Sequence, residues 1–183
     1  MSRYQTFNAI ILSTEWINEK DLRCQLLTQH DGKRWLKAPG AKASQKGSAA
    51  GLQPGNHVQV QVYRRGQNDT LQQLLIIDSP LFTVQPPEKL NTLHYMLWVL
   101  RQWCDLDHSV PDLYTLLLQA IGSLGTIQPS QLELLKRRFE RALLRAEGLW
   151  SYGDELLSFR EFRQVFEEHT HSQMPQQWLL VGA

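Results

Sequence analysis

Apolar and polar residues alternate with a period of two through most of the first 80 residues, and this pattern ends at Pro80. The clearest example is Asn56–Arg64, where Val58, Val60 and Val62 alternate with polar side chains. Such alternation is typical of a strand with one buried face. Further segments of this kind lie at 7–13, 21–28, 33–38 and 70–79. The first 80 residues therefore predict five strands and no long helix.

Five short strands with a long connection between the third and the fourth fit the five-stranded barrel that binds oligonucleotides, the OB-fold. A small SH3-like barrel fits the same pattern. After Pro86-Pro87, apolar residues recur at helical spacing and predict helices at 89–105, 111–125, 131–150 and 154–169. We therefore predict an α+β chain, with a five-stranded OB-fold β-barrel in residues 1–80 and an α-helical domain in residues 81–183.

The third predicted strand and the loop after it are basic. One strand face would carry Lys33, Trp35 and Lys37, and the other Arg34, Leu36 and Ala38. The loop from 39 to 54 adds Lys42 and Lys46 and has no acidic residue. Cations beside a flat ring suit the phosphates and bases of a single-stranded nucleic acid. The alternative stays open that Trp35 belongs to the core and that the lysines are ordinary surface residues.

Charge is unevenly distributed along the chain. The 183 residues carry a net charge of only +1. Residues 1–80 hold ten Lys or Arg against six Asp or Glu, a net +4, whereas residues 81–183 have a net −3. An anionic partner is therefore expected to meet the first half.

The third predicted helix has a basic face. It carries Lys136, Arg137, Arg138, Arg141 and Arg145. One interpretation is a solvated face paired with Glu133 and Glu140 at spacings of three and four residues. The other is a binding place for an acidic peptide, in which arginine side chains grip carboxylates beside an apolar pocket.

Motifs for chemistry are missing from the sequence. It has no nucleophile elbow, phosphate-binding glycine loop or Cys-x-x-Cys pair. Cys24 and Cys104 lie in apolar runs and are predicted to be buried, and Cys104 with His108 supplies too few ligands for a metal. We expect no catalytic residue, no cofactor and no metal. No apolar run approaches the roughly 20 residues that cross a bilayer, so we expect a soluble, intracellular protein without a membrane partner.

Three stretches, taken in order, resemble the bacterial recombination mediator family RecO. They are AIILSTEWINEKDLRCQLLTQHDGKRWLKAPGAK at residues 9–42, GLQP at 51–54 and RRFERALLRAEGL at 137–149. The family's Thr-x-x-x-Gly strand end corresponds to Thr28 and Gly32, and its basic loop motif to Pro39-Gly40-Ala41-Lys42. Its Leu-Gln-Pro and Arg-Arg-Phe-Glu motifs correspond to Leu52-Gln53-Pro54 and Arg137-Arg138-Phe139-Glu140.

The resemblance implies binding of single- and double-stranded DNA, annealing of complementary strands, and assistance in loading RecA onto strands coated by single-strand-binding protein (SSB). It implies RecR and the acidic C-terminal tail of SSB as direct partners and RecA as an indirect one. It also implies a cytoplasmic, nucleoid-associated bacterial protein. In this family the first Arg of the Arg-Arg-Phe motif, here Arg137, contacts the SSB tail, and we expect Arg138 and Arg141 beside it.

Two departures modify these expectations. Ala43 and Gln45 stand where the family often has Arg or Lys, so we expect weaker DNA binding. Many relatives extend further at the C-terminus, some with a four-cysteine zinc site. This chain has two cysteines and ends at Ala183, so we expect a shortened helical domain without zinc.

The predicted function is therefore non-enzymatic DNA binding and strand annealing in recombinational DNA repair. The predicted DNA-binding residues are Lys33, Arg34, Trp35, Lys37, Lys42, Lys46, Arg64 and Arg65. The alternative is a protein-interaction adaptor, with an OB-like barrel and a helical docking face on the third helix.

Overall fold

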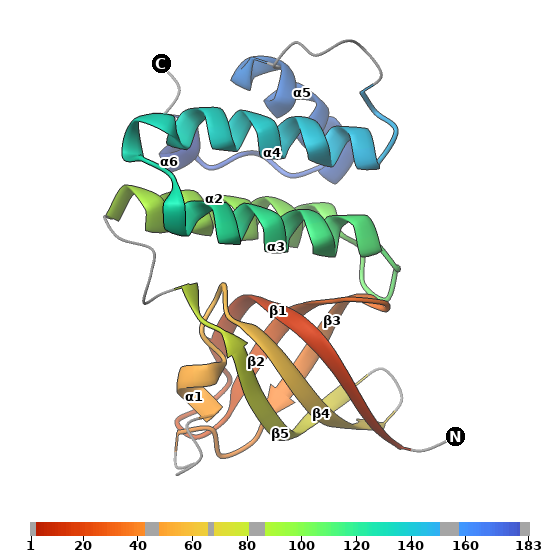
Figure 1. The fold of residues 1–183 in the computed structure, drawn as a ribbon. Helices are drawn as coiled ribbons and strands as arrows, with labels where there is room; N and C mark the ends of the chain where they lie inside the picture. The colour runs from red at the N-terminus through yellow and green to blue at the C-terminus, as the bar shows by residue number, and fades with distance from the viewer. Residues whose placement is uncertain (1–2, 43–47, 66–67, 81–86, 151–157, 180–183) are drawn as a thin grey trace.

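The computed structural model describes residues 3–42, 48–65, 68–80, 87–150 and 158–179. A β-barrel forms one layer, two helices lie across its end, and the remaining long helices cover the far side of those two (Figure 1). Apart from one short helix within the barrel region, the strands precede the helices along the chain, so the predicted α+β class is confirmed.

The barrel contains β1 (Tyr4–Trp16), β2 (Leu22–Thr28), β3 (Gly32–Ala38), β4 (His57–Arg65) and β5 (Asn68–Asp78). It closes in the order β1-β2-β3-β5-β4, with β3 parallel to β5 and the other neighbours antiparallel. This closed five-stranded arrangement confirms the predicted OB-fold over the SH3-like alternative.

The barrel interior follows from the alternation in the sequence. Val58, Val60 and Val62 of β4 are fully buried, and Leu26 of β2 and Leu36 of β3 pack into the same core. A short helix, α1 (Ser48–Gly51), lies in the segment predicted to be loop. The predicted loop lysine Lys46 lies outside the described residues.

The helical part contains α2 (Pro87–Trp103), α3 (Pro111–Thr126), α4 (Leu132–Ala146), α5 (Phe159–Thr170) and α6 (Gln176–Leu179), with a 3₁₀ turn at Pro129–Gln131 before α4. The predicted helix from 154 begins in the described residues at Phe159. Ser158 accepts a hydrogen bond from the Glu161 backbone N–H, and Glu161 accepts one from the Ser158 backbone N–H, which forms a capping box. Residues 154–157 lie outside the described part.

The barrel and the helices share a core. Ile10, Leu12 and Leu27 of the barrel belong to the same buried cluster as Leu97 of α2 and Leu117 of α3. One end of the barrel is thus closed by helices rather than open to solvent. The predicted division into domains at residue 80 coincides with the change from strands to helices but stays a prediction.

Candidate nucleic-acid interface

The outer face of β2 and β3 places a tryptophan among cations. Strand register pairs Gln25 with Trp35 and Arg23 with Lys37. The Arg23 guanidinium lies over the Trp35 ring, 4.1 Å from its centroid, and its Nε donates to Glu15 Oε1 at 2.6 Å. Trp35 is half-buried and lies outside both core clusters. It is therefore a surface ring with one face covered by a cation.

Lys37 extends this surface towards the loop after β3. Half of its side chain is exposed, and Nζ lies 3.6 Å from the Asp21 carboxylate. Hydrogen bonds from the Gly40 backbone N–H and from Asn18, together with the Lys37 charge, hold the pKa of Asp21 below its ordinary value. Lys42 is exposed on the same loop. Lys37 thus offers accessible positive charge on the same strand as Trp35, and Lys42 does so on the loop after it.

The structure buries Lys33 and Arg34, which the sequence predicts as DNA-binding residues. Lys33 is 9% exposed, and its Nζ donates to the carbonyl oxygen of Arg101 in α2 at 2.7 Å. Arg34 is 2% exposed and forms ion pairs with Asp69 of β5 and Asp31. Burial lowers the pKa of Lys33 and raises that of Asp69. Both cations bind groups within the protein rather than facing solvent.

A second basic surface lies where β1 begins and β4 ends. Arg3, Tyr63, Arg64 and Arg65 line a pocket of about 440 Å³ there. Arg3 Nη1 donates to the Tyr63 hydroxyl at 3.0 Å, and the Arg64 backbone N–H donates to the Arg3 carbonyl at 2.8 Å. Arg65 is exposed, whereas Arg64 is half-buried with Nη2 4.0 Å from Asp107.

Sequence reasoning did not identify Arg3, Tyr63 or Arg23 as site residues. Arg23 follows from the β2–β3 hairpin register, because the short turn opposes it to Lys37. Arg3 and Tyr63 meet only through the pairing of β1 with β4, which are far apart in sequence. Local alternation carries no signal for that pairing.

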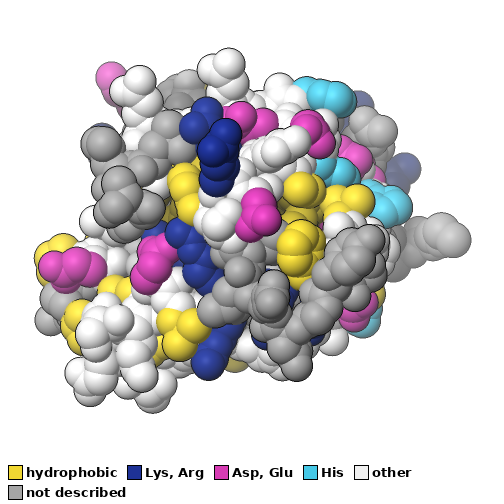
Figure 2. Space-filling model, turned by 90° about the horizontal axis from the view of Figure 1, so that it is seen from above, with side chains coloured by type: hydrophobic (Ala, Val, Ile, Leu, Met, Phe, Trp, Pro, Cys, Tyr) yellow, Lys and Arg dark blue, Asp and Glu magenta, His cyan; other side chains and the backbone are white. Residues whose placement is uncertain are grey.

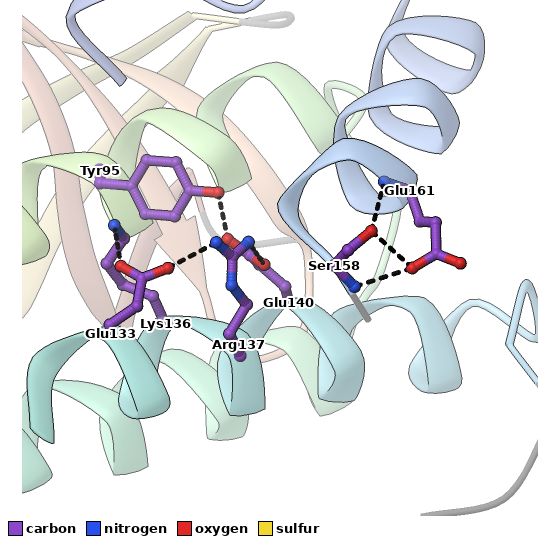
Figure 3. Close-up of polar contacts among 7 residues, drawn as sticks. All are labelled: Tyr95, Glu133, Lys136, Arg137, Glu140, Ser158 and Glu161. Carbon is purple, nitrogen blue, oxygen red and sulfur yellow. Dashed lines mark hydrogen bonds and ion pairs between the residues drawn. The ribbon is translucent and has the colours of Figure 1, made fainter. Parts of the chain in front are cut away.

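The basic face of α4 is paired with acids. The Arg137 guanidinium binds Glu133 at 2.5 Å and Glu140 at 3.1 Å, and it lies 5.0 Å from the Phe159 ring centroid. Lys136 Nζ lies 2.8 Å from the Glu133 carboxylate (Figure 3). Arg138 is exposed and Arg141 is half-buried. The ion pairing predicted at spacings of three and four residues is present.

Glu140 is fully buried beneath Arg137. It accepts a hydrogen bond of 2.6 Å from the Tyr95 hydroxyl of α2 (Figure 3). Burial raises the pKa of Glu140 above its ordinary value, although Tyr95 and Arg137 oppose that effect. Beside this network, a pocket of about 360 Å³ lies between α2, α4 and α6, and its lining includes Tyr95, Lys136 and Trp178.

The face of the molecule on the helical side mixes both signs of charge. Among its coloured side chains, basic groups lie between acidic and apolar ones rather than in one continuous field (Figure 2). This view thus shows separate small sites rather than one surface that would steer a polyanion over a long range.

The thiols and the other metal-binding groups are dispersed. Burial raises the pKa of Cys24 to about 11 and that of Cys104 to about 12. Within the described ranges, no three His, Cys, Asp or Glu side chains come together in a way that could hold a metal ion. In the same ranges, no helix combines the length and apolarity that a bilayer span requires.

The first part of the chain matches a known protein family. Residues 1–80 match the family model described as "Recombination protein O N terminal". The matched segment contains all five strands of the barrel. No curated protein matches the chain.

Proposed function

Because the chain belongs, through residues 1–80, to the RecO family of recombinational DNA repair, we propose that it binds DNA on its barrel and anneals complementary strands. The observation that carries this proposal is the outer face of β2 and β3. There Lys37 exposes its charge on the strand that carries the Arg23–Trp35 stack, and Lys42 is exposed on the loop that follows β3. Ammonium groups neutralise phosphates, and the aromatic ring offers contact to a base.

Annealing requires no covalent step. Two strands must be held close together with their phosphate charge screened, and phosphate contacts position a strand without reading its sequence. The RecO family comprises non-enzymatic recombination mediators, and we propose the same of this chain. Its further roles would be binding of double-stranded DNA and assistance in loading RecA onto SSB-coated DNA in the bacterial cytoplasm. We also propose that residues 1–80 form the DNA-binding domain and residues 81–183 an accessory helical domain.

The β2–β3 face uses fewer of the DNA-binding residues than the sequence predicts. Lys37 and Lys42 would bind phosphates at the β2–β3 face and the loop after it, with Trp35 on the same strand as Lys37. Lys46, which lies outside the described residues, is proposed as a phosphate contact from the sequence alone. Lys33 and Arg34 would instead hold β3 in place, because both charges are buried against protein partners. Arg64 and Arg65 belong to the second basic surface.

Binding of a fluorescent single-stranded oligonucleotide across a salt titration tests this proposal. Lys37→Glu/Lys42→Glu should weaken binding by more than about tenfold at roughly 50 mM salt, because attraction to phosphates becomes repulsion. Lys37→Arg/Lys42→Arg preserves both charges and should bind like the wild type. Folded wild-type protein that fails to bind at low salt would exclude the DNA-binding proposal.

A second candidate function, docking of an acidic peptide on α4, rests on a specific observation. The pocket beside Tyr95 and Trp178 is bordered by Lys136, and Arg137 lies on the same helix. We propose that the SSB tail binds here, with a tail carboxylate replacing Glu133 at Arg137. Glu133 suits this exchange because its side chain is 42% exposed, whereas Glu140 is buried. Arg138 and Arg141 would supply charge nearby.

Binding of an SSB-tail peptide tests the exchange. Arg137→Ala should abolish binding, whereas Glu133→Gln should strengthen it, because the competing carboxylate has been neutralised. Unchanged affinity in both variants would exclude this site. If peptide binding survives while DNA binding is absent, the chain is an adaptor rather than an annealing protein. RecR stays a partner proposed from the family alone.

A further inference from the structure

One row of outward-facing side chains crosses all five strands of the barrel. Register pairs Arg23 with Lys37, Lys37 with Thr70, Thr70 with Tyr63, and Tyr63 with Tyr4. Directly paired residues project from the same side of a sheet. Each of the five is exposed or half-buried, so the row lies on the outside of the barrel. It joins the β2–β3 face to the second basic surface.

The Tyr4 end of this row combines aromatic rings with cations. Tyr4 is 56% exposed, and its ring lies 5.4 Å from that of Tyr63 at an interplanar angle of 63°. Arg3 binds the Tyr63 hydroxyl, and Arg65 is exposed beside them. None of the four described residues that line this pocket is acidic. Aromatic rings beside exposed cations favour a ligand with flat faces and negative charge.

We infer that Tyr4 and Tyr63, with Arg3 and Arg65, form a second binding place for single-stranded DNA, at the β1–β4 side of the barrel. The inference rests on the proposed DNA binding and extends it. One base would stack on the exposed Tyr4 ring, and the two guanidinium groups would contact the adjacent phosphates. The strand would follow the row from Arg23 and Lys37 across Thr70 to the tyrosines.

The geometry suits a path of a few nucleotides. Neighbouring strands lie about 4.8 Å apart, so four steps from β2 to β1 give an arc of roughly 19 Å at the level of the backbone, curved around the closed barrel. An OB-fold binds about 4–16 nucleotides. The site should prefer single strands, because a duplex keeps the faces of its bases stacked and offers Tyr4 none of them.

Anisotropy of a labelled oligo(dT) of about 15 nucleotides, in a salt titration, tests the inference. Tyr4→Ala should weaken binding about 5- to 150-fold without changing the slope of log K against log salt, because stacking carries no charge. Tyr4→Phe keeps the ring and should bind within about twofold of wild type. Duplex binding by Tyr4→Ala should be unaffected.

The proposed phosphate contact of Arg65 is tested by the slope of log K against log salt. Arg65→Ala should reduce the slope by about 0.7, the value for one lost phosphate contact on a single strand. Arg160→Ala, on α5 at the far end of the molecule, removes the same exposed charge and should leave affinity and slope unchanged (Figure 1).

The two proposals fail in different ways. Wild-type levels of binding in both Tyr4→Ala and Arg65→Ala, with binding lost in Lys37→Glu/Lys42→Glu, would overturn the second place and leave the β2–β3 face standing. Wild-type protein that binds no oligonucleotide at low salt would overturn both.

Discussion

Lys33 Nζ donates a hydrogen bond of 2.7 Å to the backbone carbonyl oxygen of Arg101, which joins the start of β3 to the last turn of α2. The Lys33 carbonyl oxygen in turn accepts a hydrogen bond of 2.9 Å from the Asp107 backbone N–H in the loop after α2. A cation at a helix C-terminus also interacts favourably with the helix dipole. Lys33 therefore fastens the barrel to the helices.

Lys33→Met should destabilise the protein while keeping most of its side-chain volume. We expect a loss of about 1.5–3 kcal/mol in the free energy of unfolding, the range for a hydrogen bond to a charged group. Urea denaturation measures it. Lys37→Met on the same strand, where half of the side chain is exposed, should change stability by less than about 0.5 kcal/mol. Equal losses would mean that the Lys33 contact contributes nothing specific.

Gly32→Ala should be among the most destabilising single changes in the barrel. Gly32 has a φ of +70°, and a Cβ there would overlap the backbone carbonyl of His108. We expect a loss of more than about 3 kcal/mol, because left-handed strain of about 1–2 kcal/mol adds to that collision. Thermal unfolding provides the measurement.

Gly40→Ala is the matched control for Gly32. Its φ is +64°, and, apart from the two chain neighbours of Gly40, no atom of the described residues lies within 4 Å of the added Cβ. The change should cost only the backbone strain, about 1–2 kcal/mol. A similar loss at both positions would contradict the close approach of β3 to the loop after α2.

Asp69→Asn should leave the Arg34 guanidinium buried without its closest counter-charge. Asp69 is 1% exposed, and it joins β5 to β3 through this ion pair. Breaking a buried pair costs about 3–5 kcal/mol. Asp31→Asn removes the other carboxylate of Arg34, which is 51% exposed, and should cost less than about 1 kcal/mol. Chemical denaturation of the two variants would show comparable losses if the pair were not buried.

The barrel could be predicted from the sequence because the alternation that indicates each strand involves only neighbouring residues. Period-two alternation at Val58, Val60 and Val62 fixes which face of β4 is buried, and the turn at Gly32 fixes the β2–β3 register. The same alternation predicts Lys33 and Trp35 on one outer face, but it carries no information that α2 covers that face at Lys33. A strand pattern identifies two faces but not what packs against each of them.

The candidate site likewise contains residues that the sequence pattern identifies and residues whose role depends on contacts between distant segments. Lys37 and Lys42 are exposed on the basic stretch that sequence reasoning selected. The burial of Arg34 depends on Asp69, which lies on a strand that pairs with β3 only when the barrel closes. The meeting of Arg3 with Tyr63 depends on the pairing of β1 with β4. Contacts between distant segments determine the burial of Arg34 and the contact of Arg3 with Tyr63. The periodicity of a single sequence does not predict such contacts.

Glu140→Gln should change how stability depends on pH. Burial raises the pKa of Glu140 above its ordinary value of 4.5. At a pH between 4.5 and the raised pKa of the folded state, the folded protein binds more protons at Glu140 than the unfolded chain does. The contribution of Glu140 to stability therefore falls as the pH rises from 4.5 to that raised pKa. Glutamine does not titrate. The variant should therefore match the stability of wild type near pH 4.5. Above pH 4.5 its free energy of unfolding should rise relative to that of wild type, by at most about 1.4 kcal/mol per pH unit.

Urea denaturation of both proteins across this pH range provides the measurement, because groups common to both cancel in the difference. A flat difference between Glu140→Gln and wild type over this range would mean that the carboxyl group beneath Arg137 and Tyr95 titrates as it does in the unfolded chain.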